Sequence, residues 1–485
     1  MDDTSLRIAR IRDKLPLAKA ADAECKVFGA ASHRHVLKPP ASEDDVCAFE
    51  TLHDIALPEG FRRFIREVGN GGAGPFYGLH PLGEATTDLT YDKTPGVLAR
   101  PSLLAPRMAV DDWAVLRTRV GIDADDEAED ARSEATAALY GGVMSLGEQG
   151  CGIVHALILN GPFAGRVVNV NDEVAEHPPL FAFEADFLAW YERWLDEVIS
   201  GELAQSKGWF GYVPGGHPGD LLAGFVSCAN ERDAADFLDG LAAKPTLHPV
   251  IIGTLLRHKP VSAAQRAAIC RIVCKSHFAR AEPLLKVLAS LDPLAFLQCL
   301  HWYAGDALAQ WQDSILSPLL NIGEEETFRF FTYVLGKLPV DRGAYLAPHA
   351  RSDNEEIRAQ AFHELGKITD KANYVDCFAL GLADESPRVV RDTLQALAGV
   401  KDPALLPHYR QVAERFPVER DYVLVNLGHR FKEFGLSPTG ASPPVPMASA
   451  VAPQVPASAS PVSSGSLGHR LAGAWRRLIG ARLDN

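Results

Sequence analysis

The sequence predicts two folded domains of different classes, an α+β domain over residues 1–200 and an all-α solenoid over residues 247–434. Short apolar strands between residues 143 and 170, with helices on either side, predict a central antiparallel or mixed sheet in the first domain. From about residue 247 the pattern changes to successive helices separated by short polar turns, and two segments nearly repeat at an offset of 32 residues. Stacked helices that bury a shared core form a solenoid.

A helix is expected over residues 52–68, followed by the glycine-rich segment Gly69–Gly74. Within this range, the segment that begins at Leu57 is amphipathic, and Pro58 lies where a proline is tolerated in the first turn of a helix. Glycines adopt positive φ at no steric cost, which suits a left-handed cap and a tight turn. The apolar residues of the helix recur at helical spacing, at Phe61, Phe64, Ile65 and Val68.

The same glycines match the dinucleotide-binding pattern G-x-G-x-x-G. That pattern binds a pyrophosphate only after a strand and at the start of a helix, whose amides meet the phosphate. Here a helix precedes the glycines and Pro75–Gly78 follow without helical periodicity. We therefore interpret the segment as a helix stop and expect no phosphate site.

The strands of the sheet are expected at residues 143–146, 153–159 and 167–170, with a turn at Asn160-Gly161. A strongly amphipathic helix is expected at residues 187–199. Its apolar stripe consists of Phe187, Trp190, Tyr191, Trp194, Leu195 and Val198.

The order of these segments resembles the SUKH superfamily, of the Smi/Knr type, which includes many bacterial immunity proteins. The resemblance rests on residues 57–72, 147–168 and 187–198 and covers about 40 % of the chain. It implies an α+β fold and a cytosolic protein that binds and neutralises a toxin. The chain departs from the pattern by a long insertion between about Thr86 and Ala138, which is a candidate region for specificity.

The helical region resembles HEAT repeats. Asp353 and Asp384 are the expected N-caps of the two repeated helices. In the alignment at offset 32, Ile357, Phe362, Leu365, Ile368 and Asp370 match Val389, Leu394, Leu397, Val400 and Asp402.

Three further segments complete the predicted organisation. Residues 201–246 are interpreted as a glycine-rich connector. Residues 437–466 contain 7 Pro, 8 Ser and 6 Ala and no charge, so a disordered linker is expected. Residues 467–485 predict a basic amphipathic helix that docks onto a protein groove or lies on a membrane surface, and we favour the protein groove.

The formal net charge of the 485-residue chain is −14. Residues 437–485 contain four Arg and one Asp and carry +3, so the remainder carries −17. An acidic protein lacks the basic surface that direct nucleic-acid binding requires. The negative charge suits solubility or steering toward a basic partner, and we favour solubility. If the partner is a toxin, the charge would suit a basic, nuclease-like one. The charged start of the chain, the scattered eight cysteines and the absence of an 18-residue apolar run together predict a cytoplasmic protein without a membrane span.

Two sequence patterns suggest catalysis or calcium binding. Cys151, between two glycines and followed by His155, resembles a nucleophile with its base, but a four-residue separation along a strand would keep the two side chains apart. The acidic run approximates a calcium loop but has Ala128 where a glycine is required, so we interpret it as a solvated loop. Its carboxylates are Asp123, Asp125, Glu127, Glu129 and Glu134.

Histidines and cysteines form two further patterns. Cys270, Cys274 and His277 share a helix face and would suit zinc, but a fourth ligand is not apparent. His33 and His35 are interpreted as loop residues. We therefore expect no catalytic residue, cofactor or metal.

The remaining candidates are large aromatic residues. Trp209 and Phe210 lie in the predicted connector, where they either join two domains or stand exposed as binding anchors, and we favour the first. Trp475 lies on the apolar side of the C-terminal helix. No catalytic pattern is expected, and the SUKH resemblance implies a non-enzymatic immunity protein that neutralises a toxin. Trp209, Phe210 and Trp475 are its candidate partner contacts. The alternative is a scaffold or adaptor that brings partners together.

Overall fold

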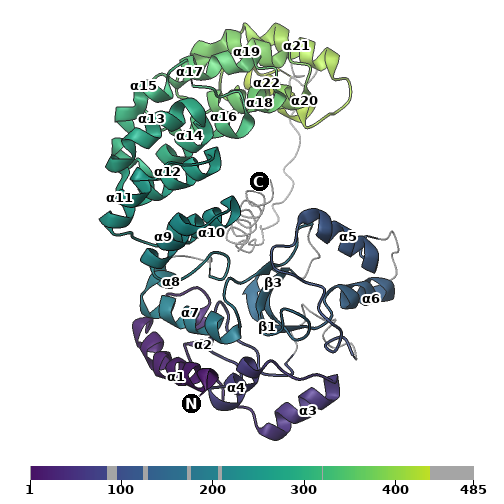
Figure 1. Ribbon diagram of the computed structural model, residues 1–485. Coiled ribbons are helices and arrows are strands. Elements are labelled where there is room, and N and C mark those ends of the chain that lie inside the picture. The colour runs from purple at the N-terminus through teal and green to yellow at the C-terminus, as the bar shows by residue number, and fades with distance from the viewer. Residues whose placement is uncertain are drawn as a thin grey trace. The chain divides into compact units, whose positions relative to one another are not determined.

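The chain forms two compact units, an N-terminal unit of residues 1–251 and a helical unit that begins at residue 252 (Figure 1). The computed structural model describes residues 2–84, 96–123, 129–171, 176–205, 210–318 and 320–436, except for the side chains of residues 129 and 130. Trp209 and Trp475, the predicted linker and the predicted C-terminal helix lie outside these ranges. None of the described helices combines the length and apolar character needed to cross a membrane.

In its described residues, the N-terminal unit contains four strands, and its helices cover both faces of the sheet. The strands are β1 (Val143–Gly150), β2 (Ile153–Ile158), β3 (Val167–Asn171) and β4 (Leu180–Phe181). The helices are α1 (Asp3–Ala21), α2 (Ala30–His33), α3 (Glu43–His53), α4 (Glu59–Glu67), α5 (Val110–Val120), α6 (Glu129–Leu139), α7 (Phe187–Ile199), α8 (Glu202–Gln205), α9 (Pro218–Ser227) and α10 (Glu231–Ala243).

The sheet is an antiparallel meander in the order β1-β2-β3-β4, which confirms the predicted α+β class. Val143 pairs with Ile158 and Ile153 pairs with Asn171, so the three longer strands lie in the predicted order. Because side chains alternate along a strand, each strand contributes residues to two separate cores. In β2, for example, Ala156 belongs to one core and Leu157 to the other.

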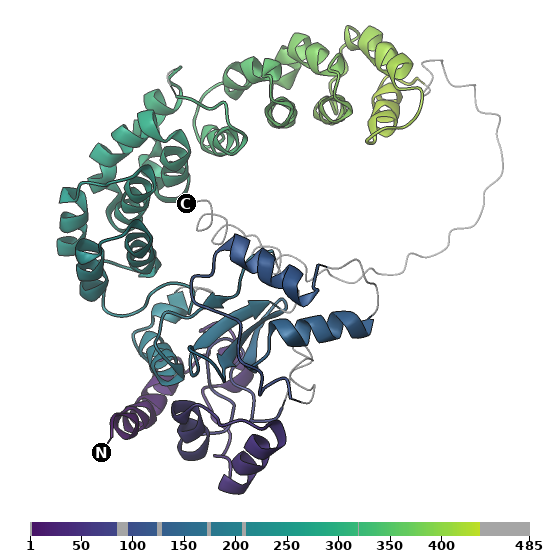
Figure 2. The same ribbon diagram turned by 45° about the vertical axis from the view of Figure 1, so that its right-hand side comes forward.

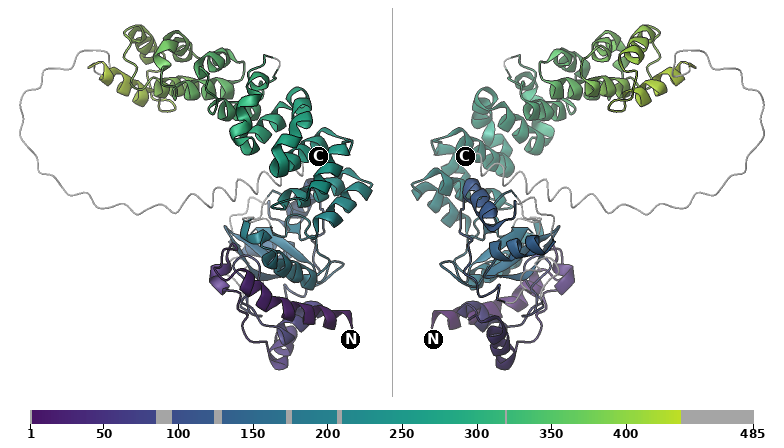
Figure 3. Two further views of the ribbon diagram at one scale, coloured as in Figure 1. Left: turned by 90° about the vertical axis from the view of Figure 1, so that its left-hand side faces the viewer. Right: turned by 90° about the vertical axis from the view of Figure 1, so that its right-hand side faces the viewer.

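Helices pack on both faces of this sheet (Figures 2 and 3). Helices α1, α4 and α7 share one core with the sheet, whereas α5 and α6 share the other. Trp113 of α5 is fully buried in the second core. The insertion expected between Thr86 and Ala138 therefore provides a structural layer of the unit.

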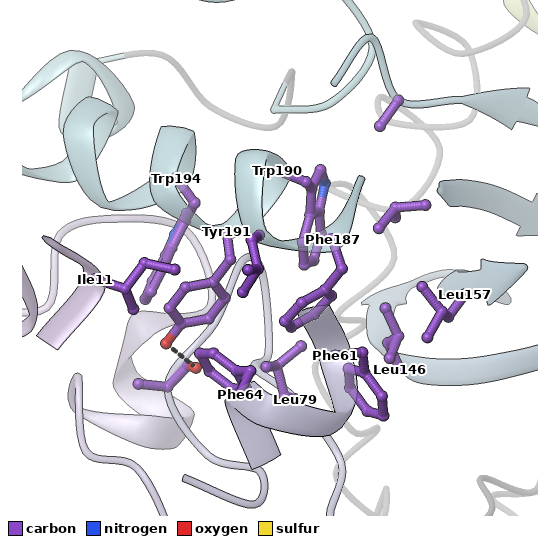
Figure 4. Close-up of a cluster of buried hydrophobic side chains, with 14 of the residues drawn as sticks. Ile11, Phe61, Phe64, Leu79, Leu146, Leu157, Phe187, Trp190, Tyr191 and Trp194 are labelled. Atoms are coloured by element: carbon purple, nitrogen blue, oxygen red, sulfur yellow. Dashed lines mark hydrogen bonds between the residues drawn. The ribbon is translucent and has the colours of Figure 1, made fainter. Parts of the chain in front are cut away.

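The first core is built around the aromatic residues of α7 (Figure 4). Phe64 of α4 lies 4.6 Å from Tyr191, measured between ring centroids. Four ion pairs also join α1 to α7 and its N-cap, including Arg7 with Asp186 and Lys14 with Asp196. The predicted helix at residues 187–199 is confirmed, and it is the element that α1 and α4 cover.

The expected single helix over residues 52–68 is wrong. Helix α3 ends at His53, and Asp54 adopts a left-handed conformation with φ of 53°. Helix α4 begins at Glu59, directly after Pro58. Because the residue before a proline disfavours the helical region, the sequence Leu57-Pro58 separates two helices.

The glycine segment after α4 forms a turn, as the helix-stop interpretation predicted. Gly72 has φ of 95° and bridges both Leu37 and Leu79. Its amide donates to the Leu79 carbonyl at 2.8 Å, and the Ala73 amide donates to the Val36 carbonyl at 2.9 Å. These amides satisfy the protein's own carbonyls, so they are not arranged to hold a phosphate.

The expected glycine-rich connector contains helices α8, α9 and α10 and belongs to the N-terminal unit. Helices α9 and α10 pack against each other. Arg107 forms ion pairs with Asp233 and Asp236 of α10, and Lys244 pairs with Glu202 at 2.8 Å. The segment is thus folded onto its own unit by helix packing and charge pairs.

The described part of the helical unit contains helices and no strands. They are α11 (Pro249–Arg257), which begins just before the boundary, α12 (Ala263–His277), η2 (Phe278–Ala281), α13 (Glu282–Leu291), α14 (Pro293–Tyr303), η3 (Gly305–Trp311), α15 (Gln312–Ile315), α16 (Glu325–Leu335), α17 (Arg342–Leu346), η4 (Ala347–Arg351), α18 (Glu355–Leu365), η5 (Lys371–Tyr374), α19 (Val375–Leu382), α20 (Pro387–Ala396), α21 (Leu405–Arg415) and α22 (Val423–Glu433).

Alternate helices of this unit lie side by side. Each of α12, α14, α16, α18 and α20 packs on the next even-numbered helix, up to α22. The first five start 30 or 32 residues apart, at residues 263, 293, 325, 355 and 387. The four apolar pairs aligned at offset 32 are all buried, from Ile357 and Val389 to Ile368 and Val400.

The N-caps predicted for the two repeated helices are wrong by one or two residues. Asn354 caps α18 by accepting from the amide of Ile357, and Ser386 caps α20 by accepting from the amide of Val389. Asp384 instead pairs with Arg358. Asn and Ser are as good at this position as Asp, so residue type alone did not distinguish them.

We predict that Gly72→Ala destabilises the N-terminal unit strongly. A Cβ at this position would lie 2.5 Å from the Val36 carbonyl oxygen, and φ is positive. Strain and overpacking together should lower the free energy of unfolding by more than about 3 kcal/mol. The control is Gly121→Ala, where φ is 89° but nothing lies within 4 Å of the added carbon. Urea unfolding should show a loss of only about 1–2 kcal/mol there, and equal losses would contradict the explanation.

Candidate functional site

The predicted nucleophile and its base do not converge. Cys151 lies exposed at the tip of the β1–β2 hairpin with φ of 54°. His155 lies on β2 and is fully buried. Its ring packs on Trp190 with centroids 5.2 Å apart and on Phe76 at 6.3 Å. Burial lowers the pKa of His155 to about 3, so the ring is a neutral part of the core.

The interpretation of His33 and His35 as loop residues is wrong for His33 and correct for His35, which lies in the turn after α2. His33 ends α2, and the ring of His35 is buried with its Nε2 atom 2.8 Å from Oδ2 of Asp22. His35 stacks on Trp194 with centroids 5.9 Å apart. Burial, together with the neighbouring His35, lowers the pKa of His33 to about 4. The H-x-H pattern is a packing feature of the first core.

The acidic run does not form the expected continuous loop, because helix α6 begins at Glu129. Asp123 pairs with Arg117 at 3.1 Å and accepts from the Thr118 hydroxyl at 3.2 Å. Glu134 pairs with Arg100 at 3.1 Å. Asp125 and Glu127 lie outside the described residues. The described carboxylates of the run are therefore engaged by different arginines.

Phe210 is the one aromatic partner candidate that the structure describes. It is buried, packs on Trp190 at 5.7 Å and lies under the Arg193 guanidinium at 5.1 Å. Two residues later, the Tyr212 hydroxyl donates to Oε1 of Gln149 at 2.8 Å. These contacts fasten the segment after α8 to α7 and the sheet, and they leave little of the Phe210 ring for a partner.

The predicted pair Cys270 and Cys274 acquires a third thiol that sequence reasoning missed. Cys299 of α14 lies with them, so that the three sulfur atoms are all within 4.8 Å of one another. His277 is not part of this group. Hydrogen bonds from Cys270 and Cys274 lower the pKa of Cys299, because they stabilise its thiolate.

The charge of the protein is divided between the units. Residues 1–251 contain 22 Lys and Arg against 39 Asp and Glu, a net charge of −17. Residues 252–436 contain 22 of each and are neutral. The acidic excess identified in the sequence therefore belongs to the N-terminal unit alone. Exposed carboxylates begin helix α5, at Asp111 and Asp112.

The helical unit instead presents aromatic side chains, at the C-terminal ends of α14 and α16. Trp302 is 50 % exposed and Tyr333 is 43 % exposed. Between them lies the buried Phe330, 5.4 Å from Trp302 and 5.6 Å from Tyr333, measured between ring centroids. His301 packs on Tyr333 at 5.3 Å. We call these four residues the aromatic patch.

An open groove of about 510 Å³ lies at the opposite ends of the same helices. Its lining includes Leu291 and Leu294, at the end of α13 and the start of α14, and acidic residues at the start of α16. Asp292, Glu324 and Glu325 supply carboxylates. Tryptophan and tyrosine dominate the binding energy of protein interfaces, and an acidic groove suits a basic side chain.

Comparison with known proteins gives no relative for either unit. No protein-family model matches the chain, and no curated protein or solved structure matches it significantly.

We predict that acid destabilises the N-terminal unit through His155. Its pKa is about 3 when folded and about 6.5 when unfolded, so the unfolded chain binds the extra proton. The stability is fully present above pH 6.5 and falls by up to about 1.4 kcal/mol per pH unit as the pH drops towards 3. In His155→Leu, urea unfolding at pH 7.5 and pH 5 should show a smaller difference than in the wild type. His248→Leu, at an exposed position of the same unit, is the control. An unchanged pH difference in His155→Leu would contradict the assignment.

Proposed function

We propose that this protein is a cytosolic immunity protein that neutralises a basic protein toxin by binding it directly. The observation that carries the proposal is the net charge of −17 on the N-terminal unit, beside a neutral helical unit. The negative charge of the N-terminal unit attracts or repels a partner according to the partner's own charge. It accelerates association with a basic partner and disfavours acidic ones.

The resemblance to the SUKH superfamily supports the same function. Its three segments lie in the α4–glycine turn, the β1–β2–β3 meander and helix α7, which together form one core. The insertion that distinguishes this chain adds α5 and α6 on the other face of the sheet. The exposed Asp111 and Asp112 at the start of α5 are a suitable contact for a basic toxin.

We further propose that the helical unit is a solenoid of the HEAT type. Support comes from the regular start of its even-numbered helices and from their side-by-side packing. Successive repeats that contact only their neighbours provide an extended face for a partner. The aromatic patch and the acidic groove lie at the two ends of α14 and α16, so one pair of adjacent repeats carries both.

A scaffold or adaptor is the second candidate, and the aromatic patch favours it. Exposed Trp302 and Tyr333 belong to the neutral helical unit. A basic toxin attracted to the acidic N-terminal unit would not need to contact them. Two binding surfaces of different chemistry on two units suit two different partners. The two candidates differ in whether protection from a toxin needs the patch.

Co-expression with the product of the adjacent gene tests the immunity function. We expect restored growth of cells that produce the toxin, and a complex that co-purifies with it. Asp111→Lys/Asp112→Lys should slow association several-fold at low salt, with a smaller effect at high salt because ions screen the attraction. Stopped-flow or surface plasmon resonance would measure the rate. The control Asp306→Lys/Asp313→Lys changes two exposed carboxylates of the helical unit and should leave the rate nearly unchanged. Absence of both a complex and protection would refute the proposal.

Trp302→Ala/Tyr333→Ala tests the aromatic patch. An aromatic anchor contributes at least about 2 kcal/mol at a binding hot spot, so affinity for the partner of the helical unit should fall at least about 30-fold. Val418→Ala, an exposed apolar residue elsewhere in the unit, should change affinity little. Isothermal titration gives the affinities, and circular dichroism checks the fold. Protection that persists in the double variant while a second partner is lost identifies the adaptor, and an unchanged set of partners contradicts a role for the patch.

A further inference from the structure

Three cysteine sulfurs converge inside the helical unit. Cys270 and Cys274 lie one turn apart on α12, and Cys299 lies on α14, which packs beside α12. The three residues are at most 2 % exposed. Among the described residues, this is the one group of three or more His, Cys, Asp or Glu whose ligand atoms gather closely enough to hold a metal. The other five cysteines, at positions 25, 47, 151, 228 and 377, do not join it.

The separations of the sulfur atoms fit a metal centre. The sulfurs of Cys270 and Cys274 are 3.9 Å apart, and all three lie within 4.8 Å of one another. A metal about 2.3 Å from each sulfur requires sulfur separations of about 3.8–4.0 Å in tetrahedral or trigonal geometry. One pair already has this separation. The third sulfur needs to move by less than about 1 Å, which a small rotation about the Cα–Cβ bond provides.

Packing alone does not require cysteine at these positions. Measured from the start of each helix, Cys299 of α14 corresponds to Phe331 of α16, Ala361 of α18 and Thr393 of α20. All three counterparts are buried, and none carries sulfur. The repeats thus fill this site with side chains of several sizes. Within the described part of the chain, three thiols converge at the α12–α14 pair alone.

We propose that Cys270, Cys274 and Cys299 bind one soft metal ion, and that this ion is Cu(I). Thiolates are soft ligands that select Cu(I), Zn(II) or iron–sulfur clusters. Zn(II) in structural sites takes four ligands, whereas this group offers three and no fourth His, Cys, Asp or Glu among the described residues. Cu(I) accepts three sulfur ligands in a plane. The inference stands apart from the proposed immunity function, because it concerns the interior of the helical unit.

Binding at this position would link two adjacent repeats. The metal would join α12 to α14 within the interior, and the free energy of binding would add to the stability of both helices. Because the sulfurs are buried, the ion would enter during folding or through local opening of the helix pair. Slow loading of the folded protein is therefore expected.

Anaerobic titration of the reduced full-length chain with Cu(I) tests the proposal. An excess of a chromophoric Cu(I) chelator is present and competes with the protein for the metal. Single exposed thiols bind Cu(I) too weakly to retain it under these conditions. We expect one Cu(I) per chain, a sulfur-to-copper absorption band in the near ultraviolet and a rise in Tm. Zn(II) in a parallel titration should bind more weakly and should fail to displace Cu(I).

The variant Cys299→Ala should lower Cu(I) affinity by at least about 100-fold, because loss of a direct ligand exceeds the effect of outer-shell changes. Cys377→Ala, in the same unit but outside the group, should bind copper as the wild type does. Circular dichroism establishes that both variants are folded.

A second measurement on the wild type holds even if Cys299→Ala misfolds. In moderate urea, Cu(I) should protect Cys270, Cys274 and Cys299 from alkylation, with the sites mapped by mass spectrometry. The proposal is overturned if folded Cys299→Ala binds Cu(I) with wild-type affinity, or if Zn(II) displaces Cu(I) from the wild type. It is also overturned if Cu(I) protects the other five cysteines from alkylation as strongly as these three.

Discussion

The aromatic stripe of helix α7 is the feature on which the N-terminal unit depends. The buried Tyr191 hydroxyl donates to the Ala73 carbonyl at 2.8 Å, which fastens the glycine turn to the middle of the helix (Figure 4). On one side, Trp194 stacks on His35 and so positions the buried pair with Asp22. On the other, Trp190 contacts both β2 and the segment after α8. Segments from residue 22 to residue 210 therefore meet on one helix. A buried hydroxyl without a partner would cost about 1–3 kcal/mol, so the turn and the helix require each other.

The elements with a strong internal periodicity were predictable from the sequence. The helix at 187–199 has six apolar residues on one face, and the strands of the meander are rich in β-branched residues between turn signals, so local pattern and final structure agree. The failures occurred where a short-range rule had competing solutions. Residues 52–68 are apolar enough for one helix, but Pro58 separates two. The burial of His35 in a turn was not predictable, because it depends on the pairing with Asp22 and the contact with Trp194, which lies far away in the chain.

The candidate sites were harder to predict because they form between repeats. Cys299 is 25 residues from Cys274 in the chain, so a search for ligands at typical local spacing selected His277 instead. Trp302 and Tyr333 occur on different helices, and each alone resembles a core residue on an amphipathic face. The register of successive helices, with starts 30 or 32 residues apart, decides which residues become neighbours. Placing the cysteine group and the aromatic patch requires the register of all the helices from α12 onwards. The sequence revealed only one clear repeat pair, so this register could not be derived from it.

The acidic excess lies in the N-terminal unit, whereas the helical unit is neutral. The N-terminal unit holds its excess of acidic groups at some cost in stability, because like charges repel one another in a compact body. Ion pairs such as Arg7 with Asp186 offset part of this repulsion, yet 22 basic residues cannot match 39 acidic ones. The helical unit contains 22 basic and 22 acidic residues in 252–436 and has no such imbalance. Fold stability alone therefore does not explain the difference. Under the proposed function, selection by a basic partner would account for the difference, since long-range attraction acts through the net charge of the unit that the partner approaches.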